Sequence, residues 1–239
     1  MIVQACINGG RPKIFHPLLP LTIDAMARDA AVAAGAAELH VHPRGADEKE
    51  SLAAVDDTIR AIRRACPGTV VGVSTGAWIE GDEDRTRDAI RHWPEVPDYA
   101  SVNLAKNDAP AVMQLLRQRG VGIEVGLASV PDAERYIGVE DHDHVFRVRI
   151  ELDHEQDLRL ARDVQEGIVG ALRRAEIRRP ILLRGFDKTV WPFVELARER
   201  GYSTRVGFED GKDLPNGTIA SDNAALAAAV VEIFRSRSN

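Results

Sequence analysis

The sequence is poor in cysteine and has no long apolar run, and both absences exclude classes of protein. Its 239 residues include two cysteines, Cys6 and Cys66, which are too few for a disulfide framework. We therefore expect free thiols and a cytoplasmic protein. No stretch of about 18 apolar residues exists, and no basic segment precedes an apolar one at the N-terminus. We expect neither a membrane span nor a secretory signal.

An excess of basic residues is also missing. The 31 lysines and arginines are outnumbered by 37 aspartates and glutamates, which gives a formal net charge of −6. Nucleic-acid binding needs a basic surface, so we expect no nucleic-acid partner. The hydrophobic share of 44% and the charged share of 28% are typical of a globular domain and exclude a disordered or collagen-like chain.

Short β-branched segments alternate with longer amphipathic segments along the chain. The expected strands are 2–7, 38–42, 69–74, 99–102, 121–125, 144–150, 181–184 and 202–207, and the expected helices are 22–34, 52–65, 83–92, 109–119, 131–137, 155–175, 190–200 and 223–235. This alternation predicts a parallel sheet covered by helices. Eight such units favour an α/β fold of the (β/α)₈ TIM-barrel type, as a single domain over residues 1–239. An open doubly wound sheet is the alternative, but no Gly-x-Gly-x-x-Gly turn follows the first strand.

The active site of such a barrel lies at the carboxyl ends of its strands, so the strand ends hold the candidate residues. The second strand ends in His40-Val41-His42, and alternation places both imidazoles on one face, about 7 Å apart along the strand. The last strand leads into Glu209-Asp210, and both strands flank the first. Two histidines and one glutamate, with a position left open, are a set suited to catalytic zinc. The alternative is a pair of core or solvent-facing histidines.

Polar residues follow the other strands as well. Ser74, Thr75 and Asn103 fit either a pocket or the N-cap of a helix. Glu124 lies among apolar positions, which indicates either a functional carboxylate or an ion pair with an arginine. Trp78 is expected to wall the pocket. The segment Asp141-His142-Asp143-His144 precedes a strand, at the opposite end of the barrel, so we interpret it as a polar loop rather than a metal site.

Five motifs occur in an order that resembles one family. They are His40-Val41-His42-Pro43-Arg44, Ser74-Thr75-Gly76, Glu124, Arg205-Val206-Gly207-Phe208-Glu209-Asp210 and Ser221-Asp222-Asn223. The chain is similar over nearly its whole length to the β-keto acid cleavage enzymes, the family of the 3-keto-5-aminohexanoate cleavage enzyme, and the Arg-x-Gly-x-Glu-Asp segment is the most specific part. The resemblance implies a zinc-dependent TIM barrel that converts a β-keto acid and acetyl-CoA into acetoacetate and a new acyl-CoA.

The resemblance also implies a role for each matched residue. His40, His42 and Glu209 would bind zinc, Asp210 would act as the base with Arg205 as its charged partner, and Glu124 and Ser74 would be polar groups of the pocket. Thr75, Gly76 and Asn103 are expected to contact substrate, and Arg44 or Arg184 would clamp its carboxylate, because arginine suits bidentate pairing. Barrel enzymes of this size often assemble, so we expect a homo-oligomer.

Two other functions fit the same residues. A zinc hydrolase would use metal-bound hydroxide, but barrel hydrolases usually place a His-x-His motif after the first strand and add histidines from later strands. Here the pair follows the second strand, and no later strand ends in histidine. A barrel that binds a metal or a small molecule without turnover is the other alternative, and the short loops after the strands favour it.

Overall fold

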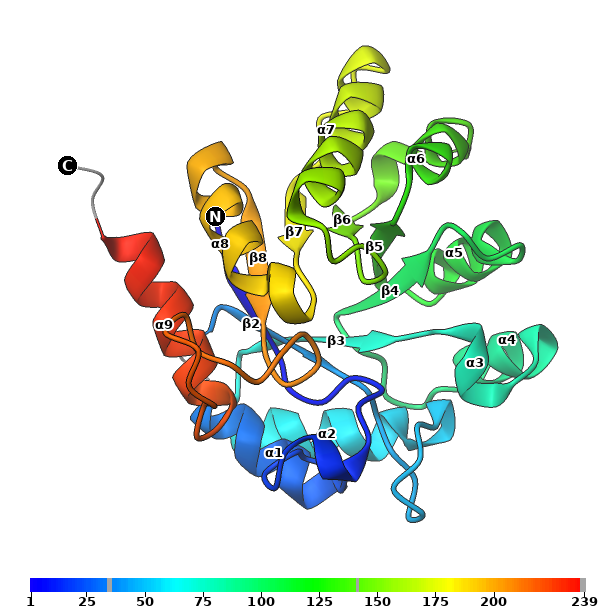
Figure 1. Cartoon of the computed structure of the whole chain (residues 1–239). Coiled ribbons are helices and arrows are strands. Elements are labelled where there is room, and N and C mark those ends of the chain that lie inside the picture. The colour runs from blue at the N-terminus through cyan, green and yellow to red at the C-terminus, as the bar shows by residue number, and fades with distance from the viewer. Residues whose placement is uncertain (34–35, 141, 237–239) are drawn as a thin grey trace.

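Eight parallel strands close into a barrel in the computed structural model, which describes residues 1–33, 36–140 and 142–236 (Figure 1). The strands are β1 Val3–Cys6, β2 Glu38–Val41, β3 Val70–Ser74, β4 Tyr99–Asn103, β5 Gly122–Leu127, β6 Arg147–Glu151, β7 Ile181–Arg184 and β8 Ser203–Val206. Each strand pairs with its neighbours in chain order, and β1 pairs with both β2 and β8. The predicted TIM barrel is confirmed, and the open sheet is excluded.

Helices surround the strands on the outside of the barrel (Figure 1). They are α1 Ile23–Val32, α2 Val55–Ala65, α3 Ala77–Glu80, α4 Glu83–Arg91, α5 Ala109–Gln118, α6 Val130–Ile137, α7 Leu158–Arg174, α8 Val190–Arg200 and α9 Asn223–Arg235, with 3₁₀ turns η1 Lys13–Phe15, η2 Leu52–Ala54, η3 His142–His144 and η4 Asp187–Thr189. The predicted bounds of α8 and α9 agree with the structure, and α3 was not predicted.

Local hydrogen bonds explain where the observed bounds differ from the predicted ones. The helix expected from residue 155 begins at Leu158, because the carboxylate of Asp157 accepts the N–H groups of Arg159 and Leu160 at 2.9 and 3.1 Å. The strand expected from residue 144 begins at Arg147, because η3 precedes it. Residues 34 and 35, the expected end and stop of the first helix, lie outside the described residues.

Alternating residues of each strand separate an apolar layer from a charged one. Side chains that face outward, such as Leu39, Val73 and Val125, are buried in the main hydrophobic core with residues of the helices. Their neighbours along the strands, such as Glu38 and Glu124, are buried as well but pair with charged and polar groups. The hydrophobic core therefore lies between sheet and helices, and the barrel interior holds ion pairs.

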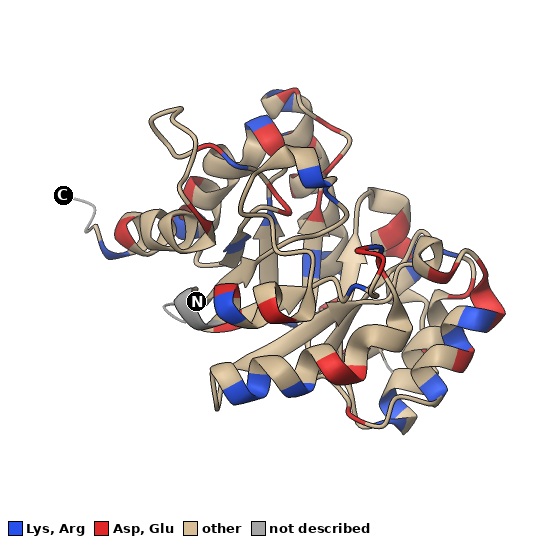
Figure 2. Ribbon diagram, turned by 90° about the horizontal axis from the view of Figure 1, so that it is seen from below, with Lys and Arg blue, Asp and Glu red and all other residues tan. Residues whose placement is uncertain are grey.

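The outer surfaces of the helices carry charges of both signs. Both lysines or arginines and aspartates or glutamates occur on the helices in the view from below (Figure 2). Within the described part of the chain, no helix has both the length and the apolar character that crossing a bilayer requires.

Asn223 connects the two ends of the chain beside the barrel mouth. Its amide nitrogen donates to the carbonyl of Ile7 at 2.8 Å and to the carboxylate of Asp29 at 2.6 Å. Its amide oxygen accepts the N–H of Phe208 at 2.7 Å. Burial raises the pKa of Asp29 to about 6, although the hydrogen bond from Asn223 acts in the opposite direction.

This raised pKa predicts that Asp29→Asn stabilises the protein above pH 6. Between about pH 4 and 6 the folded state binds a proton that the unfolded state has released, so the contribution of Asp29 to the free energy of unfolding falls as the pH rises through this range. Removal of the charge should add about 1–2 kcal/mol at pH 7.5 and less at pH 5. Urea unfolding at both pH values measures the difference.

The control is Asp24→Asn, which removes an exposed carboxylate from the same helix. It should change the free energy of unfolding by less than about 0.5 kcal/mol at either pH. A loss of stability in Asp29→Asn at pH 7.5 would show that the hydrogen bond to Asn223 outweighs the burial of the charge.

Candidate metal centre and active site

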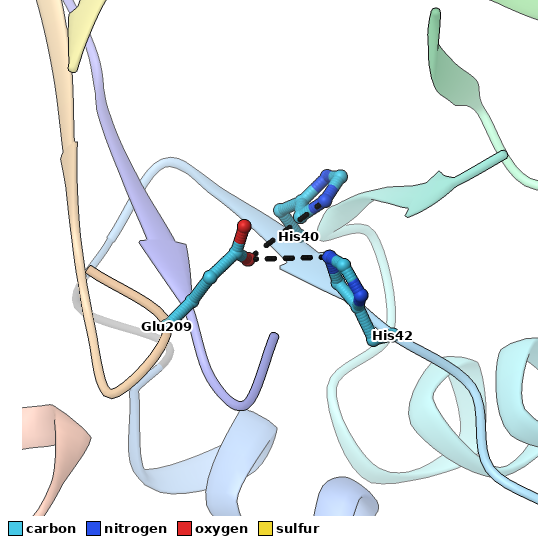
Figure 3. A group of neighbouring side chains, drawn as sticks. All are labelled: His40, His42 and Glu209. Atoms are coloured by element: carbon cyan, nitrogen blue, oxygen red, sulfur yellow. Dashed lines mark ion pairs between the residues drawn. The ribbon is translucent and has the colours of Figure 1, made fainter. Parts of the chain in front are cut away.

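Three buried side chains converge at the carboxyl end of the barrel. His40 belongs to β2, His42 follows it, and Glu209 lies in the loop after β8 (Figure 3). Glu209 Oε2 is 3.5 Å from His42 Nε2 and 3.9 Å from His40 Nε2, and one ligand atom of each residue lies within 4.8 Å of the others. Ligands of a tetrahedral zinc ion are about 3.3 Å apart, so a small inward movement would suit one cation.

The unused bonding capacity of these atoms also fits a metal ion. Glu209 Oε2 is buried and accepts no hydrogen bond from the residues that the structure describes. Burial lowers the pKa of His40 well below its ordinary value, so its ring is neutral and able to donate a lone pair. Burial also disfavours a proton on His42, but Glu209 and Glu50 outweigh this effect and raise the pKa of His42 to about 9. Two carboxylates thus favour positive charge at this point.

The loop after β8 is held against β1, and this contact places Glu209. Gly207 lies so close to β1 that a Cβ atom there would be 2.0 Å from the carbonyl oxygen of Cys6. The N–H of Glu209 donates to the same carbonyl at 3.2 Å. A side chain at position 207 would therefore displace the loop and the candidate ligand with it.

Glu50 orients His42 and was not identified from the sequence. Its Oε1 pairs with His42 Nδ1, which leaves Nε2 directed at Glu209. Histidine ligands are commonly held in this way by a carboxylate on the second ring nitrogen. Glu50 lies eight residues beyond His42 in the sequence. An isolated antiparallel bridge between Arg44 and Glu50 brings this segment back beside His42. Neither feature has a recognisable local sequence pattern.

Ten charged side chains form one continuous ion-pair network below and around the triad. Arg147 joins Glu38 to Glu124, and Arg149 joins Glu124 to Glu151. The remaining contacts link Arg184 with Glu151, Asp153, Glu209 and Asp210, and Arg205 with Glu209 and Asp210. With all groups ionised, the network has four positive and six negative charges. The excess equals the charge of one divalent cation.

The predicted site residues divide into those that line the central cavity and those that do not. The cavity has a volume of about 390 Å³ and is lined by the predicted His40, His42, Ser74, Asn103, Arg184 and Glu209, by Trp78 as expected, and by Gly10, Arg11, Pro12, Ser101, Arg149, Glu151, Asp153 and Phe186. Thr75, Gly76, Arg44, Glu124, Arg205 and Asp210 do not line it.

The residues outside the cavity have structural contacts that explain their positions. Thr75 donates its hydroxyl to the carbonyl of Ser101 at 2.7 Å. Arg44 binds the carbonyls of Gly9 and Glu48, which places its guanidinium on the backbone of two loops. Gly76 supports the ring of Trp78.

Glu124 and Asp210 are carboxylates enclosed by arginines. Glu124 is fully buried, and although burial alone would raise its pKa, Arg147 and Arg149 lower it well below the ordinary value. Asp210 Oδ1 accepts hydrogen bonds at 2.8 Å from both Arg184 Nε and Arg205 Nη2. The predicted pairing of Asp210 with Arg205 is present, and Arg184 is a second partner.

Arg11 is a further residue at the site that the sequence did not reveal. It donates to the carbonyls of Glu209 and Asp210 at 3.0 and 3.1 Å, and to Asp187 at 2.6 Å. Its guanidinium lies between the rings of Phe15 and Phe186, 4.4 and 4.1 Å from their centroids. Arg11 therefore holds the backbone of the loop that carries the candidate ligand.

The histidine-rich segment before β6 does not form a comparable group. His142 to His144 make up η3, and Asp141 lies outside the described residues. Among the residues that are described, His40, His42 and Glu209 form the one group of this kind able to hold a metal ion.

The contact between Glu50 and His42 predicts that Glu50→Gln weakens zinc binding about 10- to 100-fold, because the amide orients the ring less strongly and lowers its basicity. Competition titration with a chromogenic chelator measures the affinity. Glu48→Gln is a control, since Glu48 lies in the same loop and contacts Lys13 instead. Equal zinc affinity of the two variants would show that Glu50 does not support a metal ligand.

Comparison with known proteins gives the chain a family. Two segments, residues 1–152 and 153–239, match the beta-keto acid cleavage enzyme family. The chain is 26% identical to the 3-keto-5-aminohexanoate cleavage enzyme of Fusobacterium nucleatum, over 98% of this chain and 91% of that protein. It is 22% identical to the 3-oxoadipate:acetyl-CoA acetyltransferase of Cupriavidus necator, over 97% of this chain and 87% of that protein.

Solved structures share the fold at low sequence identity. A ternary complex of ObcA with a C4-CoA adduct and oxalate superimposes with a TM-score of 0.73 at 17% identity, over 90% of this chain and 63% of that one. The chain thus spans about three fifths of the length of ObcA. A 3-hexulose-6-phosphate synthase gives a TM-score of 0.56 at 17% identity, over 98% and 99% of the two chains. The match over both segments shows that the chain belongs to the β-keto acid cleavage enzyme family.

Proposed function

We propose that this chain cleaves a small β-keto acid with acetyl-CoA, giving acetoacetate and a new acyl-CoA, at a zinc centre held by His40, His42 and Glu209. The observation that carries the proposal is the convergence of these three buried ligands on a cavity of about 390 Å³. Family membership supports the reaction class, and one relative is named for acetyl-CoA transfer. The cavity volume suits a small acid.

Zinc fits the donor set, because imidazole nitrogens are ligands that it prefers. Nε2 of each histidine and Oε2 of Glu209 would hold it, with Glu50 fixing the ring of His42. A bound zinc ion would supply Lewis acidity toward the carbonyl oxygen of the β-keto group.

Asp210 is the proposed base, and two arginines contact its carboxylate. Arg184 and Arg205 each donate a hydrogen bond to its Oδ1 at 2.8 Å. Because it is fully buried, substrate must displace part of this contact before an oxygen of Asp210 reaches the α-proton. Arg184 lines the cavity. Its movement toward a substrate carboxylate would both bind the substrate and release an oxygen of Asp210.

Ser74 and Asn103 are the proposed polar contacts of the substrate, because both line the cavity. Asn103 accepts a hydrogen bond from Arg149 at 3.1 Å, and Arg149 in turn binds Glu124 at 2.9 Å. Glu124 thus acts as a positioning residue, through Arg149. We therefore propose this indirect role for Glu124 in place of the expected role as a polar group of the pocket.

The proposed reaction uses these residues in two stages. Asp210 takes the α-proton, and the carbanion attacks the thioester carbonyl of acetyl-CoA, so that a C–C bond forms and the CoA thiolate leaves. The thiolate then attacks the original keto carbonyl, the adjacent C–C bond breaks, and the new acyl-CoA forms. The departing acetoacetate carbanion recovers a proton from Asp210, which closes the cycle.

Metal content is the first test. Elemental analysis of untagged protein should find about one zinc per chain, and the double variant His40→Ala, His42→Ala should lose it. The double variant His92→Ala, His144→Ala is the matched control, because both of its histidines are exposed and outside the site. Zinc retained in the first variant would place the metal elsewhere.

The role of Asp210 predicts that Asp210→Asn keeps its zinc but loses kcat by about 10²- to 10⁴-fold. The assay follows consumption of a panel of β-keto acids with acetyl-CoA, and reactions without acetyl-CoA test for hydrolysis. Full activity of Asp210→Asn would exclude it as the base. Zinc-loaded wild-type protein that forms no acyl-CoA from any acid would exclude the transferase reaction.

A further inference from the structure

A second cavity adjoins the catalytic one. It has a volume of about 410 Å³ and shares Trp78, Asn103, Glu151 and Asp153 with the first. Its remaining wall comes from β5 and from the segments after β4, β5 and β6, namely Ala105, Lys106, Gly126, Ala128, Asp132 and His154. The shared residues make the two cavities neighbours along one surface, so a ligand too long for the first can extend into the second.

Trp78 stands where the two cavities meet and is held there. Half of its surface is exposed, although it is one of the largest apolar side chains. Its indole N–H donates to Glu50 Oε2 at 3.2 Å, and its ring lies against Gly76, where a Cβ atom would be 2.3 Å away. An exposed ring fixed in this way offers a rigid apolar face to a ligand.

Small residues form part of the wall beyond Trp78. Ala105, Gly126 and Ala128 contribute little or no side chain, and a Cβ atom at position 126 would lie 2.4 Å from Glu151 and 2.9 Å from Asn103. The carboxylates of this wall are engaged within the protein. Glu151 and Asp153 pair with Arg184 at 3.1 and 3.2 Å, and Asp132 accepts the N–H of Ala128 at 3.0 Å.

Lys106 provides a cation at the outer part of this wall. Its Nζ is 5.9 Å from the centroid of the Trp78 ring, and its side chain is exposed. It forms no ion pair with any residue in the described ranges. An ammonium group beyond an aromatic ring and a wall of small residues is suited to a phosphate at the far end of a bound molecule.

We propose that this second cavity receives the thioester co-substrate: Trp78 packs against the pantetheine arm of acetyl-CoA, and Lys106 pairs with one of its phosphates. The inference rests on the proposed function and adds to it the direction from which the thioester enters. A long, thin, amide-bearing arm fits a wall of small residues and one aromatic face, and the acyl end then reaches the cavity of the triad.

The test compares acetyl-CoA with acetyl-pantetheine, which carries the same thioester and no phosphate. Trp78→Ala should raise KM about tenfold for both thioesters and should raise KM for the β-keto acid less, because Trp78 lines both cavities. Lys106→Gln should raise KM about three- to tenfold for acetyl-CoA alone, and added salt should reduce the difference. Trp78→Phe keeps an aromatic face without the N–H and should retain most of the thioester affinity.

Lys188→Gln is the matched control, because Lys188 is exposed in the loop after β7, which contributes to the catalytic cavity from another side. Unchanged KM values for acetyl-CoA in both Trp78→Ala and Lys106→Gln would overturn the inference and leave the proposed function intact.

Calorimetric titration of zinc-loaded protein with coenzyme A separates this site from turnover. Weaker binding in Trp78→Ala and Lys106→Gln, but not in Lys188→Gln, supports the site even if no β-keto acid is consumed. Equal binding in all variants, or no binding by the wild type, overturns it.

Discussion

The ion-pair network inside the barrel is the interaction on which the rest of the structure depends. Charges in a protein interior lose their hydration, and they are tolerated only when each has a close partner of opposite sign. Here every arginine of the network contacts at least two carboxylates, and the contacts cross from β2 through β5, β6 and β7 to β8. The strands are thus joined by side chains as well as by backbone hydrogen bonds. The same network places the guanidinium groups of Arg184 and Arg205 against Glu209 and Asp210, and although burial alone would raise the pKa of Glu209, this positive charge lowers it well below its ordinary value.

The sequence was sufficient to predict the features that follow from strand periodicity or from a position at the end of a strand. Strand alternation placed His40 and His42 on one face, and the topology of a barrel brought Glu209 beside them, because β1 pairs with both β2 and β8. The apolar positions of each strand likewise predicted a sheet covered by helices. These inferences rest on strand periodicity and on the order of strands in a barrel.

The missed parts depend on loops and on contacts between distant charges. Glu50 and Arg11 lie in irregular segments whose conformation follows from tertiary contacts, so no local pattern marks them. Glu124 was placed correctly on its strand, but whether a buried carboxylate faces a pocket or an arginine is decided by residues on the neighbouring strand. Arg184 was expected to bind the substrate carboxylate because of its residue type. In the structure, four carboxylates of the protein contact it.

The attachment of Glu209 to the first strand has a consequence for how the protein folds. The triad joins residue 42 to residue 209, which are 167 positions apart, and Glu209 comes into place only when the loop after β8 docks on Cys6. Such contacts form late, because closing so long a stretch of chain carries a large entropic cost. An intermediate that lacks the last strand would have both histidines but no third ligand. Tight metal binding would therefore begin only when β8 pairs with β1 and the barrel closes. A bound ion would then stabilise the closed barrel.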